Sequence, residues 1–142
     1  MKPYKSHFFV IGCLMISLCY SLKSNAQNVE NGKKIYETRC LVCHQADGGG
    51  VPNMNAPLDG STNVISNDIA RLVKIIKNGF NEKVELDGLY YSNTMTPNPD
   101  FTAAQISDVL SYIRTSWSNK ASKVTFAQVQ QMIKSNYKTS SK

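Results

Sequence analysis

Two cysteines and a histidine lie within five consecutive residues, and no other feature of the sequence constrains the fold as strongly. The run is Cys40-Leu41-Val42-Cys43-His44. Its thiols lie about one helical turn apart, so both can form thioethers with the vinyl groups on one side of a porphyrin. The next imidazole then faces the iron, and this spacing is the attachment signature of c-type haem. The motif therefore predicts one haem, bound covalently by Cys40 and Cys43, with His44 as an axial iron ligand.

Residues 1–26 have the layout of a secretory signal peptide. Two lysines precede an apolar run from Phe8 to about Tyr20, and residues 24–26 supply the small side chains that a signal peptidase reads. We expect cleavage after Ala26 and a periplasmic location. The alternatives are an uncleaved anchor helix, for which an apolar run of about 13 residues is short, and a lipid anchor at Cys13. Cys13 lies within a sequence that resembles a lipobox, but the apolar run continues beyond it.

Three other kinds of site use paired cysteines. A structural zinc site needs about four ligands, but after cleavage the chain keeps only Cys40, Cys43 and His44 as cysteine and histidine ligands. A thioredoxin-like redox pair needs an α/β domain, whereas the pattern here is almost wholly helical. A disulfide is compatible with an oxidising compartment, but it leaves His44 without a role.

The charges are unevenly distributed along the chain. The 16 basic and 10 acidic residues give a net charge of +6, which alone could indicate a nucleic-acid partner. Residues 27–119, however, carry 8 basic and 10 acidic side chains, and residues 120–142 carry five lysines and no acid. We therefore predict a slightly acidic domain over 27–119, a basic extension over 120–142, and no nucleic-acid partner. No stretch of 18 apolar residues occurs, which excludes a multi-pass membrane protein.

The first predicted helix runs from Asn28 to His44 and carries the cysteine motif at its end. Asn28 can cap it, and Glu30 in the first turn suits the helix dipole. Gly32 and Tyr36 share a face with the two cysteines. A glycine at such a position indicates that another helix crosses closely there. Residues 45–63 follow as a long loop rich in glycine and proline, long enough to wrap a large ligand.

Further helices are predicted downstream. The helix over 66–78 ends before Gly79 and has an apolar stripe of Ile65, Ile69, Leu72, Val73 and Ile76. On its other face, Arg71, Lys74 and Lys77 are expected to point to solvent. A helix from Thr102 starts with a capping box to Gln105 and has the stripe Ile106, Val109, Leu110, Ile113 and Trp117.

Between these helices, residues 83–91 indicate a small hairpin around Asp87-Gly88, followed by a turn-rich loop over 93–99. Near the C-terminus, Thr125 with Gln128 repeats the capping pattern. It predicts a short last helix, with fraying expected from Ser135 onward.

Three methionines remain after the signal as candidates for the sixth iron ligand. Met95 lies in the loop before the capped helix, where nearby prolines can stiffen the backbone and a thioether can lie opposite His44. Met132 lies on an apolar helix face, which favours core filling. Met54 follows His44 by only ten residues, in the loop expected on the histidine side. We therefore predict His44 and Met95 as the two axial ligands.

Several segments match one known family. They are Gly32 and Tyr36 with the cysteine–histidine motif, residues 56–60, residues 93–97 around Met95, and residues 110–114. With them the chain resembles class I c-type cytochromes, of the small bacterial kind with a single haem, over residues 28–118. The resemblance implies an all-α cytochrome c fold packed around one covalent haem. It also implies that the C-terminal helix crosses the first near Gly32 and Tyr36.

The chain departs from the family pattern at three places. A family proline that offers its carbonyl to the second nitrogen of the histidine is replaced by Ala56, whose carbonyl can still serve. Thr96 separates Met95 from Pro97, where a proline often follows the methionine directly. Residues 120–142 lie outside the common fold.

The resemblance implies an electron carrier and not an enzyme. Its iron would cycle between Fe(III) and Fe(II) with both axial ligands in place, and the thioether would favour Fe(II). The implied partners are redox proteins such as a periplasmic dehydrogenase or a terminal oxidase, because the hairpin before Met95 resembles domains that accompany them. The alternatives are a haem-based sensor or peroxidase-like enzyme with an open sixth position, and a subunit of a larger oxidoreductase. The basic extension could contact a membrane surface or an acidic partner, or only add stability.

Overall fold

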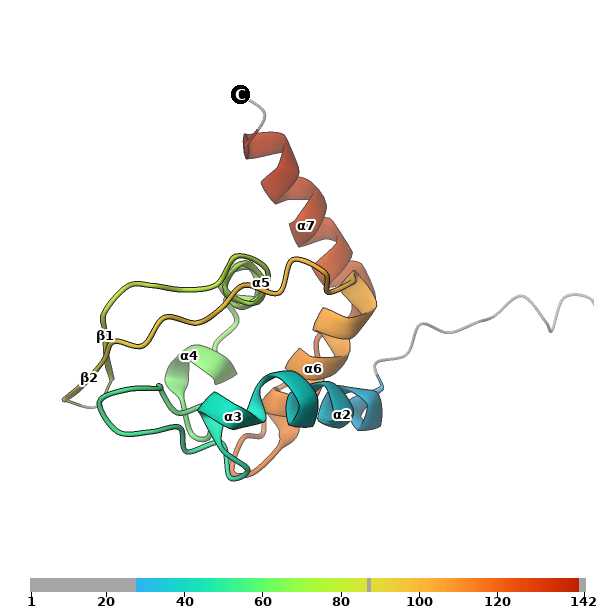
Figure 1. Ribbon diagram of the computed structural model, residues 1–142. Helices are drawn as coiled ribbons and strands as arrows, with labels where there is room; N and C mark the ends of the chain where they lie inside the picture. The colour runs from blue at the N-terminus through green and yellow to red at the C-terminus, as the bar shows by residue number, and fades with distance from the viewer. Residues whose placement is uncertain (1–27, 87, 141–142) are drawn as a thin grey trace, which may run out of the picture.

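The computed structural model describes residues 28–86 and 88–140 and is mostly helical, with one small hairpin (Figure 1). Its elements are α2 (Val29–Arg39), α3 (Leu41–His44), α4 (Thr62–Ile65), α5 (Ile69–Asn78), β1 (Val84–Leu86), β2 (Leu89–Tyr91), α6 (Ala103–Thr115) and α7 (Phe126–Ser140). This confirms the predicted fold class. The predicted signal, the anchor alternatives and Asp87 of the hairpin turn lie outside the described residues. In the described part, no helix is both long and apolar enough to cross a bilayer.

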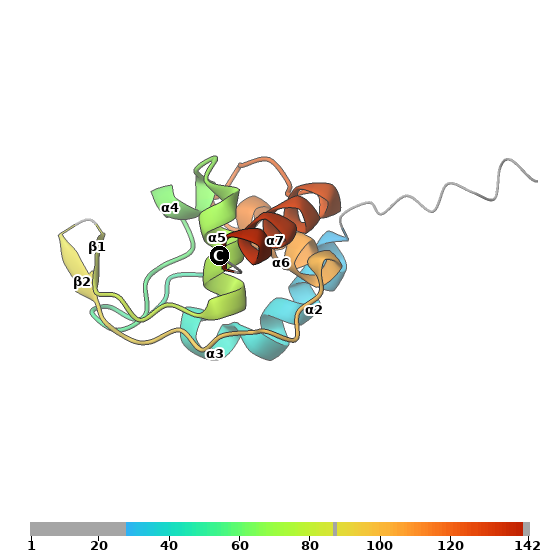
Figure 2. The ribbon, with the colours of Figure 1, turned by 90° about the horizontal axis from the view of Figure 1, so that it is seen from above.

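Helices α2 and α6 cross in close contact, as the sequence predicted. Both views show them side by side (Figures 1 and 2). A Cβ at Gly32 would collide with the carbonyl oxygen of Asp108 and lie 2.9 Å from the Cβ of Tyr112. The carboxylate of Asp108 also accepts hydrogen bonds from the Asn28 backbone at 2.8 Å and from the Asn31 side chain at 2.7 Å. The crossing is therefore fixed by backbone contact and by a polar tie at the start of α2.

The predicted first helix is interrupted at Cys40, so the single helix over 28–44 was wrong in this detail. Cys40 has φ −116° and ψ −33°, which ends α2 and starts the short helix α3. The next residue after α3, Gln45, has φ 63°. A change of dihedral angle at one residue barely alters the spacing of apolar side chains, so periodicity does not reveal it. The predicted cap by Asn28 is confirmed by its bond from the Asn31 amide.

The segment before α5 also differs from the prediction. Residues 62–65 form α4, although the predicted loop extended to residue 63, and α5 begins only at Ile69, where Asp68 caps it by accepting from the Arg71 amide. Ile65 therefore belongs to α4 and is 42% exposed, so its assignment to the buried stripe was wrong. The rest of the stripe is buried, and Gly79 ends α5 with φ 74° as predicted. The start of α5 is set by the Asp68 cap and not by the apolar spacing from which the start at residue 66 was predicted.

The hairpin and the following loop are tied back to α5. Strands β1 and β2 pair antiparallel, with Leu86 opposite Leu89. Phe80 and Met95 form an isolated antiparallel bridge, with N–H to carbonyl distances of 3.0 and 2.7 Å. The chains that leave α5 and return to α6 therefore run alongside each other (Figure 1). This pairing fixes the backbone of Met95 against the end of α5.

The last two helices begin as predicted. Thr102 and Gln105 form the capping box of α6, and Thr125 with Gln128 makes the equivalent hydrogen bonds before α7. The predicted stripe residues Ile106, Val109, Leu110 and Ile113 are buried, but Trp117 lies beyond the end of the helix at Thr115. Helix α7 runs to Ser140, so the expectation of a short helix frayed from Ser135 was wrong. Polar residues alone do not end a helix when no glycine or proline interrupts them.

We expect Gly32→Ala to destabilise the chain by about 1–3 kcal/mol or more, because the added methyl group meets backbone atoms of α6 that cannot rotate away. Urea denaturation would measure the change in the free energy of unfolding. Gly49→Ala is the matched control, since a Cβ there meets only the flexible carboxylate of Asp47, at 3.2 Å. Equal stabilities of the two variants would contradict the close crossing.

Candidate functional site

All four predicted site residues line one cavity of about 490 Å³. Cys40, Cys43 and His44 reach it from α3 and the residue before it, and Met95 reaches it from the loop before α6. Apolar side chains of α5 and α6 form much of the wall, among them Leu72, Ile75, Ile76, Val109, Leu110 and Ile113. Volumes of roughly 300–1,000 Å³ with mostly apolar walls are typical of cofactor sites. The fold therefore gathers distant segments around a space suited to a flat, apolar group.

His44 is oriented by a backbone carbonyl. Its Nδ1 lies 3.2 Å from the carbonyl oxygen of Ala56, so the position where the family has proline still supplies the acceptor. With the proton on Nδ1, the lone pair is left on Nε2, the form of histidine that binds metals. Burial lowers the pKa of His44, and the hydrogen bond to Ala56 opposes this shift. The imidazole is therefore held neutral and in one tautomer.

The two cysteines carry free thiols that differ in exposure. Cys40 is partly buried against the core, and Cys43 is exposed. Burial raises the pKa of the Cys40 thiol to about 11, with Arg39 opposing the shift and Cys43 adding to it. Thioredoxin-like pairs depend on a lowered thiol pKa, so this environment does not favour that alternative.

The three candidate methionines lie in different surroundings. Met95 is partly buried, packs against the core and is held by its bridge to Phe80. Met54 also lines the cavity but is 50% exposed, and its carbonyl accepts from the Asn93 amide at 3.1 Å. Met132 does not line the cavity and packs against the core from α7, as predicted for a core-filling residue. Two methionines therefore line the cavity, and they differ in burial: Met95 packs against the core, whereas Met54 is half exposed.

Of the two arginines that line the cavity, one is paired with a carboxylate of the described residues and the other is not. The charged residues among the described lining residues of the cavity are Arg39, Arg71 and Glu82. Arg39 donates to both carboxylate oxygens of Asp100, at 3.1 and 3.2 Å, and stacks on Phe101. The guanidinium of Arg71 lies 5.7 Å from the ring centroid of Phe80 and has no carboxylate or hydrogen-bond partner among the described residues.

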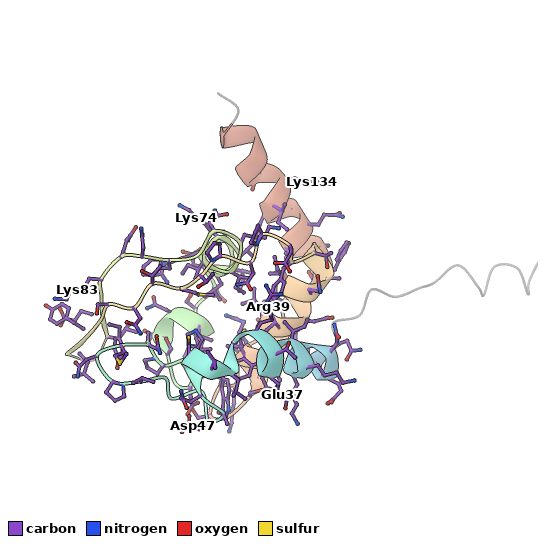
Figure 3. The ribbon with its side chains drawn as sticks, in the orientation of Figure 1. Glu37, Arg39, Asp47, Lys74, Lys83 and Lys134 are labelled. Carbon is purple, nitrogen blue, oxygen red and sulfur yellow. The ribbon has the colours of Figure 1, made fainter. Side chains whose placement is uncertain are left out.

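The expected solvent face of α5 is therefore only partly right. Arg71 lines the cavity, and the ammonium of Lys77 donates to the carbonyl oxygens of Pro99 and Phe101. Lys74 alone of the three points outward, on the upper side of the molecule in Figure 3. The signal for Arg71 is its spacing: it precedes Ile75, another lining residue, by one helical turn.

The described residues fit a haem better than a bare metal ion. Within residues 28–86 and 88–140, no three histidine, cysteine, aspartate or glutamate side chains come together as a metal-binding group. The cavity instead combines two thiols, a neutral imidazole, a thioether, apolar walls and one unpaired guanidinium. The haem itself offers matching groups: vinyls, an iron, an apolar ring and carboxylates.

Comparison with known proteins gives a consistent result. The family model of cytochrome c matches residues 29–117. The cytochrome c subunit of the quinone alcohol dehydrogenase of Gluconacetobacter polyoxogenes is 34% identical over 110 residues, which cover 71% of this chain and 22% of that subunit. The same values hold for the subunit of Komagataeibacter europaeus. Cytochrome c-552 of Thermus thermophilus is 31% identical over 92 residues, covering 63% of this chain and 70% of that protein. The chain thus spans about a fifth of the length of the dehydrogenase subunits.

Proposed function

Because this chain belongs to the cytochrome c family, we propose that it is an exported, periplasmic electron carrier with one covalently bound haem. The observation that carries the proposal is the convergence of Cys40, Cys43, His44 and Met95 on one cavity. The haem, when bound, supplies a one-electron Fe(III)/Fe(II) couple. The chain contributes attachment, axial ligands and exclusion of water, and it needs no catalytic residue.

The roles of the four residues follow from their chemistry. Cys40 and Cys43 hold the haem as thioethers. His44, with Nδ1 committed to Ala56, offers Nε2 to the iron, and Met95 offers its sulfur. A thioether ligand favours Fe(II), and the apolar walls disfavour the extra charge of Fe(III), so both raise the reduction potential. With His44 and Met95 both bound to the iron, it would have no free position for a substrate.

The haem carboxylates need a partner at the rim of an apolar cavity. We assign this role to Arg71, because Arg39 is already neutralised by Asp100. The planar guanidinium of arginine matches a carboxylate with two parallel hydrogen bonds. Phe80 supports the guanidinium by stacking, which limits the rotamers it can adopt.

A dehydrogenase is the electron donor we propose. Its basis is the similarity to two proteins described as cytochrome c subunits of quinone alcohol dehydrogenases. The match covers 22% of those subunits, so this chain would serve as a single-haem module, either free or within a complex. A terminal oxidase is the acceptor we propose. Such partners dock transiently through small, polar contacts that allow fast turnover.

The first prediction concerns attachment. The haem of the exported protein should stay with the polypeptide in acid–acetone extraction, and the mass should include one haem. Cys43→Ala should lose one thioether and much of the yield. Val42→Ala, at an 84% exposed position between the cysteines, is the control and should attach haem normally. Haem that extracts freely from the wild-type protein would exclude the assignment.

The second prediction distinguishes the two methionines at the cavity. Met95→Ala should lose the ferric sulfur–iron charge-transfer absorption, lower the reduction potential and allow carbon monoxide to bind. Met54→Leu should change none of these, because Met54 is assigned no bond to the iron. The opposite result would transfer the ligand role to Met54. Carbon monoxide binding by the wild-type protein would instead favour the sensor or peroxidase-like alternative.

The third prediction concerns Arg71. Arg71→Met should lower the reduction potential by an amount on the order of tens of millivolts, because removing a nearby positive charge stabilises Fe(III). The effect should persist at high salt, since a partly buried pair is weakly screened. Lys74→Met removes the same charge from the exposed face of α5 and is the matched control. Equal shifts of the reduction potential in the two variants would show that Arg71 does not pair with the haem carboxylates.

A further inference from the structure

Three consecutive residues after α6 contact two chain segments next to His44, one that follows it in the sequence and one that is hydrogen-bonded to it. They are Trp117, Ser118 and Asn119. The first segment, residues 45–48, continues directly from His44, and the second, residues 56–60, begins with the alanine whose carbonyl accepts from the imidazole. None of the three residues lines the cavity. Any effect they have on His44 must therefore pass through these segments.

Trp117 holds the first segment. Its indole Nε1 donates to the carbonyl oxygen of Ala46 at 2.9 Å, and its ring covers Gly48, where a Cβ would lie only 2.7 Å from the ring. Trp117 itself has φ 54°, a conformation that a bulky residue rarely adopts. The Tyr36 hydroxyl also donates to this segment, to the carbonyl oxygen of Gln45 at 2.6 Å.

Ser118 and Asn119 hold the second segment. The backbone amide of Ser118 donates to the carboxylate of Asp59 at 2.9 Å, and its hydroxyl donates to the same oxygen. The Asn119 side chain accepts from the Gly60 amide at 3.0 Å and donates to the carbonyl oxygens of Leu58 and Ile113, at 3.0 and 2.9 Å. Asn119 is only 4% exposed, so these bonds are shielded from water.

The two segments are also joined to each other. The amides of Leu58 and Asp59 donate to the carbonyl oxygen of Gly48, at 2.7 and 3.0 Å, and the Gly50 amide donates to that of His44 at 3.2 Å. The distance of 3.2 Å between His44 Nδ1 and Ala56 is therefore set by how the two segments sit relative to each other. Residues 117–119 are hydrogen-bonded to both segments.

We infer that Trp117–Asn119 is a positioning element for His44. It keeps the carbonyl of Ala56 within hydrogen-bond distance of Nδ1 and so sets how strongly the imidazole donates electrons from Nε2. The inference rests on the proposed function, because it requires His44 to bind the haem iron. A strong Nδ1 hydrogen bond makes the imidazole a more basic ligand, which stabilises Fe(III) and lowers the reduction potential. Removing the hydrogen bonds made by residues 117–119 should therefore weaken the bond to Nδ1 and raise the reduction potential.

The test compares variants of the haem-loaded chain. Trp117→Phe removes the N–H donor together with part of the ring that covers Gly48, and Ser118→Ala removes only the hydroxyl. Two readouts are needed: the reduction potential, and the hydrogen-exchange rate of His44 Nδ1–H in the ferrous protein by NMR. In the double variant the exchange rate should rise roughly tenfold, as the loss of a hydrogen bond allows, and the potential should shift to more positive values.

Ser111→Ala is the matched control. Ser111 lies on α6 and makes two buried hydrogen bonds with Val124, at 3.0 and 3.1 Å, so its loss also destabilises the fold but leaves residues 45–60 untouched. In the Ser111→Ala variant, the exchange rate of His44 Nδ1–H and the reduction potential should equal those of the wild type. If the Trp117→Phe and Ser118→Ala variants behave like Ser111→Ala in both measurements, the proposed positioning role is wrong. If the wild-type iron lacks a histidine ligand altogether, it is the proposed function that fails.

Discussion

The crossing of α2 and α6 is the contact on which the rest of the site depends. Gly32 lets the two backbones meet, so the far end of α2, with the cysteine motif after it, has a fixed position relative to α6. Tyr36, Tyr112 and Trp117 then pack together beyond the crossing, with ring centroids 5.4 to 5.9 Å apart. Through these edge-to-face and tilted contacts, the positions of the two helices determine the position of the loop after His44. A disturbance at Gly32 would thus reach the proposed iron ligand without any direct contact.

The methionine side of the cavity is built by a separate set of contacts that centre on α5. The last residues of this helix bond to the returning loop: the Asn98 amide donates to Ile76, and Lys77 donates to Pro99 and Phe101. Together with the Phe80–Met95 bridge, these bonds fix the loop along its length. The cavity therefore lies between two walls, one carrying His44 and one carrying Met95, and bonds from Arg39 to Asp100 and from Asn93 to Met54 join them. Such bracing keeps ligand positions similar in both oxidation states, which a fast electron carrier requires.

Local signals in the sequence predicted the parts of the fold that are decided locally. The caps at Asn28, Thr102 and Thr125 and the glycine at the helix crossing depend on a few neighbouring residues, and each was predicted correctly. The break at Cys40 was missed because one dihedral angle does not change apolar spacing. The bonds of Trp117, Ser118 and Asn119 to the two segments near His44 join residues 59 to 71 positions apart, which no short window contains. The roles of the four site residues remain predictions, since they concern bonds to a haem.

The first part of the basic extension packs against the same core as the cavity, although the cytochrome c match ends at residue 117. Val124 and Val129 are fully buried, and the buried guanidinium of Arg114 bonds the carbonyl oxygens of Val64, Ser66 and Ser122, which joins the extension to α4 and α6. The start of α7 is therefore packed against α6 and α5, and the C-terminal part of the helix extends above them (Figure 1). Lys134 on α7 and Lys74 on α5 lie on the upper side of the molecule in Figure 3, whereas Glu37 and Asp47 lie on the lower side. Because α7 packs against the core through Val129, Met132 and Ile133, Lys134 is held on one side of the cavity, and an acidic partner attracted to it would approach from that side.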